Sequence, residues 1–215
     1  MGSEKTARIV CSSEPLQHAA MRDARYRVFA HVRIFIAPGV LDALACRRVQ
    51  AAMDVGTPEE AEVLDDGFEV QDEVRRATLI DVVDAMLAMV EATLDEIRVP
   101  IASFYGLTLE SREGANILRY ETGGFYRPHV DRAHVPSWPL TERRQVTVVL
   151  FLESAREAEP TGGFSGGILR LFPDEGDPIE IIPKGGTLVA FPAGMRHEVT
   201  RVTAGRRDTI VDWFY

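Results

Sequence analysis

Cysteine is scarce in this 215-residue chain, where Cys11 and Cys46 each lack a second potential metal ligand nearby in sequence. A disulfide framework is therefore not expected, and the pattern is typical of a reducing compartment. The chain also lacks an apolar run of the roughly 18–20 residues needed to span a bilayer, and its N-terminus has no apolar centre of a secretion signal. We therefore expect a cytoplasmic protein that does not enter a membrane.

Positive charge is also in deficit, with 24 Lys and Arg residues against 33 Asp and Glu residues and a formal net charge of -9. Non-specific binding to nucleic acid or to an anionic membrane needs a net basic surface, so neither partner is expected. The remaining composition, 46% hydrophobic and 27% charged, is that of an ordinary globular protein. The length suits one domain with a substantial core.

The first half of the chain predicts a short tail followed by a supporting layer of helices. Residues 1–25 are polar and aperiodic and predict a flexible N-terminal tail, so the single domain is expected over residues 26–215. Apolar spacing within residues 26–114 predicts, in order, a strand over Arg27–Ile36, a helix over Val40–Met53, an acidic loop over Gly56–Asp66, a helix over Leu79–Arg98 with Thr78 as its N-cap, and a second helix over Ile101–Ser111.

After Gly114 the pattern changes to short apolar segments separated by Gly, Pro and Asp. Many short strands without intervening helices favour a barrel or sandwich over a parallel α/β sheet. The fold class that we predict is mostly β with supporting helices, in which residues 115–215 form a jelly-roll core. The expected strands are Asn116–Tyr120, Gln145–Leu152, Ile168–Phe172, Ile179–Ile182, Thr187–Phe191, His197–Val202 and Thr209–Tyr215.

Three residues in this second half have the chemistry of a metal site. His129 and Asp131 are two apart, so in extended chain their side chains point to the same face. His197 begins a later expected strand. Two imidazoles and one carboxylate are the ligand set of non-heme iron(II) oxygenases, and they leave coordination positions open. A His-x-Asp tripeptide alone is common by chance, so these three residues leave a structural role open. The other histidines, His18, His31 and His134, are interpreted as surface or core residues.

Arg207 follows His197 by ten residues and adds a cation to this set. A dicarboxylate that chelates iron at one end needs a partner for its far carboxylate, and the planar guanidinium binds a carboxylate through two parallel hydrogen bonds. Alternation along the strand places Arg207 and Thr209 on a face without acids, while Arg206 shares its face with Asp208 and Asp212. We therefore predict that Arg207 faces the interior, and that Thr209 adds a hydroxyl to the same carboxylate.

At this point the sequence resembles the 2-oxoglutarate/iron(II) dioxygenase superfamily, in its prolyl 4-hydroxylase-like branch. The resemblance covers roughly residues 115–215 and consists of several motifs in the family's order. These are Leu118-Arg119-Tyr120, Gly123-Gly124-Phe125-Tyr126, His129-x-Asp131, the Val146–Leu152 strand, Gly166-Gly167-Ile168-Leu169, the segment from Lys184 to Phe191, His197-Glu198-Val199 and Gly205-x-Arg207.

The resemblance implies a double-stranded β-helix and an enzyme that uses Fe(II), 2-oxoglutarate and O2, with ascorbate as an optional addition. It implies that His129, Asp131 and His197 bind the metal, that Arg207 anchors the co-substrate, and that Tyr120 donates a hydrogen bond to it. An intact Asp131 favours hydroxylation over halogenation. The implied substrate is a prolyl or related carbon in a peptide, an amino acid or another small molecule. The loops over Asp65–Arg76 and Arg132–Arg144 are expected to form the lid and entrance, and possible substrate contacts within them are Arg75, Arg76, Trp138, Arg143 and Arg144.

Two other functions were weighed against this one. A nucleic-acid demethylase of the same superfamily carries a second arginine six residues beyond the anchor, where this chain has Trp213. A cupin-like metal-binding protein or isomerase would keep the histidines but has no need for a carboxylate clamp of the kind that Arg207 provides. Both patterns therefore fit this sequence less well than a hydroxylase does.

Overall fold

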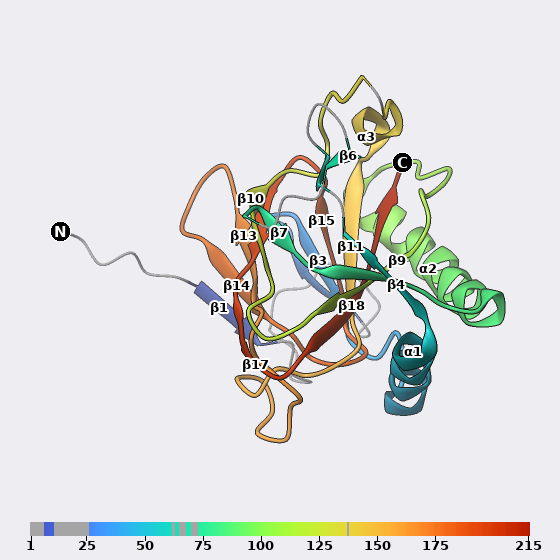
Figure 1. Ribbon diagram of the computed structural model, residues 1–215. Coiled ribbons are helices and arrows are strands. Elements are labelled where there is room, and N and C mark those ends of the chain that lie inside the picture. Colours follow the sequence, from blue (N-terminus) through green and yellow to red (C-terminus); the bar gives the residue numbers. More distant parts are fainter. Residues whose placement is uncertain (1–6, 11–25, 62, 65–67, 70–72, 137) are drawn as a thin grey trace.

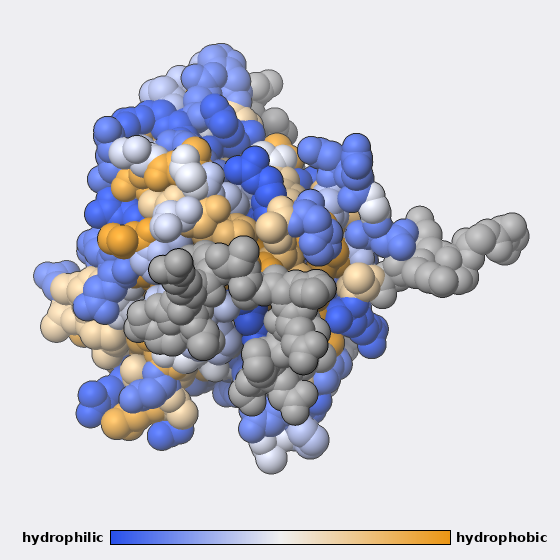
Figure 2. All heavy atoms as spheres, turned by 180° about the vertical axis from the view of Figure 1, so that it is seen from behind, coloured by the Kyte–Doolittle hydropathy of each residue, from blue (hydrophilic) through white to orange (hydrophobic). Residues whose placement is uncertain are grey.

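The computed structural model describes residues 7–10, 26–61, 63–64, 68–69, 73–136 and 138–215, and strands dominate its architecture (Figure 1). Most strands belong to two sheets that pack against each other, and the two long helices lie beyond the larger sheet. Seen from behind, hydrophilic side chains occupy much of the rim and hydrophobic ones gather nearer the middle (Figure 2). The mostly β fold with a jelly-roll core that the sequence predicts is confirmed.

The larger sheet is antiparallel throughout its described part. At its centre, Val149 lies between Val189 and Val211 in the register of the three middle strands. The strands run in the spatial order β2 (Arg27–Phe29), β3 (Ile34–Ala37), β15 (Leu188–Pro192), β11 (Val146–Phe151), β18 (Arg207–Phe214), β9 (Asn116–Tyr120), β8 (Thr78–Asp81) and β4 (Thr57–Glu60).

The smaller sheet covers one face of the larger one. Its order is β1 (Ala7–Val10), β14 (Ile179–Ile182), β13 (Leu169–Phe172), β16 (Arg196–Val199), β10 (Phe125–His129) and β7 (Arg75–Arg76). Two short ladders lie outside these sheets: β12 (Ser165–Gly166) with β17 (Val202–Ala204), and β5 (Val63–Leu64) with β6 (Phe68–Glu69). The buried core between the two sheets consists of Ile34, Ile36, Val149, Phe151, Leu169, Leu171, Ile179, Ile181, Val189 and Phe191.

The long helices α1 (Ala43–Val55) and α2 (Asp84–Tyr105) pack on the outer face of the larger sheet, and α3 (Leu140–Arg143) is a single short turn. Asp42 caps α1, because its carboxylate accepts a hydrogen bond from the Ala45 amide at 2.7 Å. The buried helix side chains are Cys46, Val49, Met53, Val90, Leu94, Ile97 and Ile101. This layer is the scaffold of the sheet that carries Arg207 and Tyr120.

The predicted strand over Arg27–Ile36 is instead a hairpin of β2 and β3. The alternating apolar pattern fits both strands, and the turn between them has neither Gly nor Pro to mark it. Arg33 takes the left-handed conformation there, with φ 54°. Because the turn depends on a residue that rarely adopts this conformation, periodicity alone did not reveal it.

The helix predicted over Leu79–Arg98 with Thr78 as its N-cap is wrong at its start, because Thr78–Asp81 forms strand β8. The helix begins at Asp84, after Val83, which makes no side-chain capping bond. The separate helix predicted over Ile101–Ser111 is also wrong: α2 continues through Pro100 to Tyr105. Its apolar face is buried against the sheet, and this packing holds the last turns in place despite the missing amide of Pro100.

Two segments predicted to lack regular structure contain strands. Within the predicted tail of residues 1–25, Ala7–Val10 forms β1 and pairs in parallel with β14; the rest of that range, including Cys11 and His18, lies outside the described residues. Within the predicted loop Gly56–Asp66, Thr57–Glu60 forms the edge strand β4. Both are edge strands of only four residues, too short for hydrophobic periodicity to give a clear signal.

Candidate active site

His129, Asp131 and His197 come together at one end of the smaller sheet. His129 is the last residue of β10, and it lies directly opposite His197 of β16 in the antiparallel register. Asp131 follows two residues after His129, and its amide donates a hydrogen bond to the Ala193 carbonyl at 3.0 Å. Val130, between the two, is exposed. Strand pairing therefore produces the convergence that the sequence predicts.

The facing atoms of these three residues lie within reach of a single ion. One carboxylate oxygen of Asp131 is 3.5 Å from Nε2 of His129, and the other is 3.4 Å from Nε2 of His197. One potential ligand atom from each residue lies within 4.8 Å of the others. Among the His, Cys, Asp and Glu side chains of the described residues, these three lie close enough together to hold a metal ion.

Hydrogen bonds to the backbone assign the tautomer of both histidines. Nδ1 of His129 lies 2.8 Å from the Arg127 carbonyl oxygen, and Nδ1 of His197 lies 3.0 Å from that of Met195. Each Nδ1 must therefore carry a proton and donate it, which leaves the lone pair of Nε2 directed toward Asp131. This is the form in which imidazole binds a metal.

The ionisation states of the site also suit a metal. Burial raises the pKa of Asp131, but the two histidines and the Thr147 hydroxyl outweigh it and hold that pKa well below its usual range. Thr147 donates to the carboxylate at 2.6 Å. Burial lowers the pKa of His197 to about 4. At neutral pH the site therefore presents a carboxylate and a neutral imidazole, as metal coordination requires.

Arg207 is the first residue of β18 and lies opposite Tyr120 of β9. It is only 1% exposed, yet its Nε and Nη1 atoms have no hydrogen-bond partner among the residues that the structure describes. Its guanidinium carbon lies 5.0 Å from the ring centre of Tyr120 and 5.4 Å from that of Phe151. Burial lowers the pKa of Arg207 to about 10, so it remains a cation at neutral pH. A buried cation without an anion is costly, and a bound carboxylate would remove that cost.

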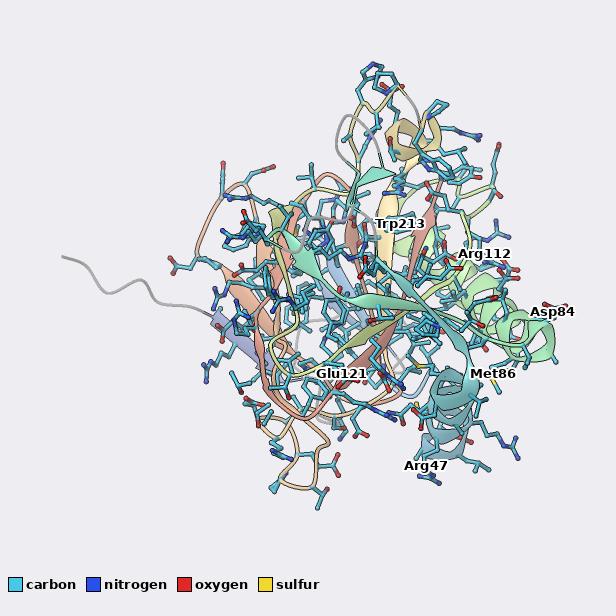
Figure 3. The ribbon with its side chains drawn as sticks, in the orientation of Figure 1. Arg47, Asp84, Met86, Arg112, Glu121 and Trp213 are labelled. Atoms are coloured by element: carbon cyan, nitrogen blue, oxygen red, sulfur yellow. The ribbon has the colours of Figure 1, made fainter. Side chains whose placement is uncertain are left out.

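The neighbouring Arg206 lies on the other face of the strand, as alternation predicts. It forms ion pairs with Asp54 of α1 and with Asp208. The face that carries Asp208 and Asp212 is buried as well, because it is covered by α1 and α2. The acids are paired there with Arg119 and Arg112, and Arg112 is seen beside α2 in Figure 3. The face of β18 that carries Arg207 borders the cavity, as predicted. The opposite face carries the acids, but it is covered by helices and is not exposed to solvent.

The Thr209 hydroxyl, unlike Nε and Nη1 of Arg207, already has a hydrogen-bond partner among the described residues. Thr209 is fully buried, and its hydroxyl donates to the Leu150 carbonyl at 3.0 Å. The proton that would have contacted a bound carboxylate is therefore already used. Its predicted role in co-substrate binding stays a prediction that the geometry does not favour.

A cavity of about 900 Å³ contains the metal candidates, Arg207 and Tyr120 in its walls. Of the predicted substrate contacts, Arg75, Trp138 and Arg144 line it, whereas Arg76 and Arg143 do not. Arg143 lies instead over the Tyr215 ring. Part of the predicted entrance loop over Asp65–Arg76 lies outside the described residues. The arrangement places aromatic and cationic side chains around the metal candidates.

Two aromatic side chains of the cavity, Tyr126 and Trp213, had no predicted role, and both pack against predicted residues. Tyr126 stacks on His129 with 3.5 Å between ring centres, and the Arg75 guanidinium lies over its other face. Arg144 forms a buried ion pair with Glu113 and lies 3.7 Å from the ring centre of Trp213. Trp213 lies six residues after Arg207 on the same face of β18, so alternation along that strand is the signal that would have found it. Tyr126 lies three residues before His129, and both reach the cavity because the register of β10 shifts between them, which alternation does not predict.

The histidines interpreted as having no metal role lie apart from the site where the structure describes them. His31 and His134 are both exposed, and His134 contacts Glu142 across the loop that contains α3. Within the described ranges, no helix is both long enough and apolar enough to cross a membrane.

Known proteins with a similar fold include prolyl hydroxylases. Residues 115–215 match the family described as the 2OG-Fe(II) oxygenase superfamily. A prolyl-4-hydroxylase from Pseudomonas putida is 27% identical, with a TM-score of 0.63, and the alignment covers 84% of this chain and 91% of that one. A search of curated protein sequences found no relative.

Two further solved structures share the fold at lower identity. A prolyl hydroxylase from Trichoplax adhaerens, in complex with a hypoxia inducible factor peptide fragment, is 18% identical with a TM-score of 0.65, covering 85% of this chain and 83% of that one. A viral collagen prolyl hydroxylase from Paramecium Bursaria Chlorella virus-1, in a 2OG complex, is 18% identical with a TM-score of 0.58, covering 84% and 94%.

Proposed function

We propose that this chain, which matches the 2OG-Fe(II) oxygenase superfamily over residues 115–215, is an oxygenase of the prolyl hydroxylase-like branch and hydroxylates an unactivated carbon of a prolyl or related substrate. The substrate would be a peptide, an amino acid or another small molecule. The observation that carries the proposal is the single cavity whose walls hold both the His129, Asp131 and His197 group and the unpaired buried guanidinium of Arg207.

His129, Asp131 and His197 fit iron(II) as its protein ligands. Both Nε2 atoms and the ionised carboxylate point at the same space, and three protein ligands leave room for a co-substrate and O2. Thr147 holds the carboxylate in orientation, and the carbonyls of Arg127 and Met195 hold the imidazoles. The residues are therefore organised before the metal binds, which lowers the cost of assembling the site.

Arg207 fits the far carboxylate of 2-oxoglutarate, with Tyr120 as a second donor. The Tyr120 ring lies against the guanidinium, and no hydrogen-bond partner for its hydroxyl is found within the described ranges. When bound, iron(II) and 2-oxoglutarate supply the oxidative chemistry, in which O2 and the co-substrate become succinate, CO2 and the hydroxyl oxygen of the product. The protein orients the reactants and excludes water from the buried end of the cavity.

The cavity walls near the metal candidates suit an uncharged ring. Tyr126 and Trp213 present aromatic surface there, and Trp213, labelled in Figure 3, belongs to the C-terminal strand β18. Arg75 adds a cationic group that can bind carbonyl or carboxylate oxygens flanking the reacting carbon, whereas the guanidinium of Arg144 is already paired with Glu113. The named prolyl hydroxylases among the similar structures support a prolyl group as the first substrate to test.

The test is succinate formation from 2-oxoglutarate with added Fe(II), with prolyl peptides, free amino acids and metabolites offered in turn. We expect a prolyl compound to stimulate succinate formation and to gain one oxygen atom, measured by mass spectrometry. Stimulation only by a compound from a different class would contradict the prolyl assignment. Absence of any iron-dependent 2-oxoglutarate consumption would contradict the enzyme function itself.

Thr147→Val should weaken iron binding without removing a ligand. The valine keeps the shape of the side chain but cannot donate to the Asp131 carboxylate, whose orientation then becomes less fixed. Loss of such an outer hydrogen bond costs about 10–100-fold in metal affinity. Anaerobic Fe(II) titration measures the effect, and Thr147→Ser, which retains the hydroxyl, is the control. Equal affinities for both variants would rule out this role of the hydroxyl.

Tyr120→Phe distinguishes a co-substrate donor from a core tyrosine. The ring and its contact with Arg207 are kept, so only the hydroxyl is lost. A hydrogen bond to a charged group contributes about 1.5–3 kcal/mol, so KM for 2-oxoglutarate should rise by roughly 10–100-fold. An unchanged KM with unchanged thermal stability would show that Tyr120 serves only in packing.

A further inference from the structure

Gly167 lies against the stem of Arg207 in the described structure. A Cβ atom built on Gly167 would be 2.8 Å from Cδ of Arg207, closer than side-chain carbons approach one another. It would also be 3.1 Å from Val202 and 3.2 Å from Phe164, which are both fully buried. The absence of a side chain at position 167 therefore makes the space through which the arginine reaches the cavity.

The backbone around Gly167 is held in place, so a side chain there would displace Arg207 more readily than the main chain. Its amide donates to the Arg201 carbonyl at 3.2 Å, next to the β12 and β17 ladder. The preceding Gly166 approaches the same carbonyl so closely that a Cβ would be 2.2 Å from its oxygen. The movable group in this contact is the flexible arginine stem.

Packing alone sets the position of the Arg207 guanidinium. An arginine is usually oriented by hydrogen bonds, but Nε and Nη1 of this one have no partner in the described part of the chain. The rings of Tyr120 and Phe151 lie near the guanidinium, and Gly167 lies against the side-chain stem. Displacing the stem on the Gly167 side therefore shifts the guanidinium itself.

We infer that Gly167 sets the depth at which Arg207 holds the far carboxylate, and thereby selects the chain length of the 2-oxo diacid. The inference rests on the proposed function, because it takes Arg207 as the co-substrate anchor. A methyl group at position 167 moves the stem away from the β12 end and into the cavity. The distance between the anchor and the metal ligands becomes shorter, so a shorter diacid fits better than 2-oxoglutarate does.

The experiment measures diacid binding by calorimetry in the Mn(II)-loaded protein without O2, and so needs no turnover. The ligands are 2-oxoglutarate, oxaloacetate, which is one carbon shorter, and 2-oxoadipate, which is one carbon longer. Gly167→Ala should raise Kd for 2-oxoglutarate at least about fivefold, since overpacking typically costs about 1–3 kcal/mol. Its preference for oxaloacetate over 2-oxoglutarate should rise at least about fivefold relative to the unaltered protein.

Gly106→Ala is the matched control for backbone strain. Gly106 has φ 63°, close to the 59° of Gly167, but a Cβ there would meet nothing within 4 Å. Both variants should lose similar thermal stability from the left-handed conformation. In Gly106→Ala, however, Kd for every diacid should stay within about twofold of the unaltered value, because no packed side chain is displaced.

A double variant provides a second test of the inference that does not depend on how well Gly167→Ala folds by itself. Adding Val202→Ala removes one of the other side chains that the new methyl would meet, so it should recover at least about threefold of the lost 2-oxoglutarate affinity. An unchanged chain-length preference, or a shift toward 2-oxoadipate, would overturn the inference while leaving the proposed function intact. Failure of the unaltered protein to bind any of the diacids would instead contradict the proposed function.

Discussion

Asp131→Ala is expected to lower iron-dependent succinate formation by at least about 100-fold, because it removes the only anionic ligand of the three. The two remaining imidazoles hold a ferrous ion more weakly and provide no charge to balance it. Both binding and turnover should therefore fall, as Fe(II) titration and succinate formation at saturating 2-oxoglutarate will show.

The fold should survive this substitution. The backbone of Asp131 is held by its own amide, which donates to the Ala193 carbonyl, and by Arg144, which donates to the Asp131 carbonyl at 3.1 Å. Asp177→Ala, an exposed aspartate far along the chain, is the matched control and should behave as the unaltered protein does. Turnover of Asp131→Ala at the control's rate would refute the assignment of this carboxylate to the metal.

Arg207→Lys is expected to raise KM for 2-oxoglutarate by roughly 10–100-fold, the cost of about one charge-assisted hydrogen bond. The ammonium group keeps the positive charge but cannot form the two parallel hydrogen bonds of a guanidinium. It also loses the contacts of the planar group with the rings of Tyr120 and Phe151. The rise in KM should exceed the fall in kcat, since the reacting atoms lie at the other end of the co-substrate.

Arg206→Lys is the control for this prediction, because the two arginines are adjacent and lie on opposite faces of β18. Arg206 pairs with Asp54 and Asp208 on the helix side, where its side chain is 38% exposed. A partly exposed ion pair contributes little, so KM for 2-oxoglutarate should change less than about twofold. Similar KM values for the two variants would mean that Arg207 does not hold the diacid.

The strands after residue 114 could be predicted from sequence because each is a short apolar segment bounded by residues that favour turns. Asn116–Tyr120 and Ile179–Ile182 match β9 and β14 at both ends. The same rules failed before residue 114, where Leu79 fits a helical stripe as well as a strand. Its strand conformation depends on pairing with Leu118 of β9, which is a long-range contact that local periodicity does not contain.

The metal candidates and Arg207 could be predicted because alternation along a strand decides which side chains share a face. Alternation along a strand does not predict which side chains pack against one another in the cavity. The stack of Tyr126 on His129 and the buried ion pair of Arg144 with Glu113 were therefore missed. Thr209 shows a further limit. Its face was predicted correctly, but the nearest acceptor for its hydroxyl is a backbone carbonyl of the neighbouring strand.

The most direct test of the central claim is a crystal structure of the protein with Mn(II) and 2-oxoglutarate, prepared without O2. We expect Nε2 of His129, Nε2 of His197 and the Asp131 carboxylate to coordinate the ion, and the far carboxylate of the diacid to form two hydrogen bonds with Arg207. An ion bound elsewhere, or a diacid whose far carboxylate pairs with another cation, would contradict the account.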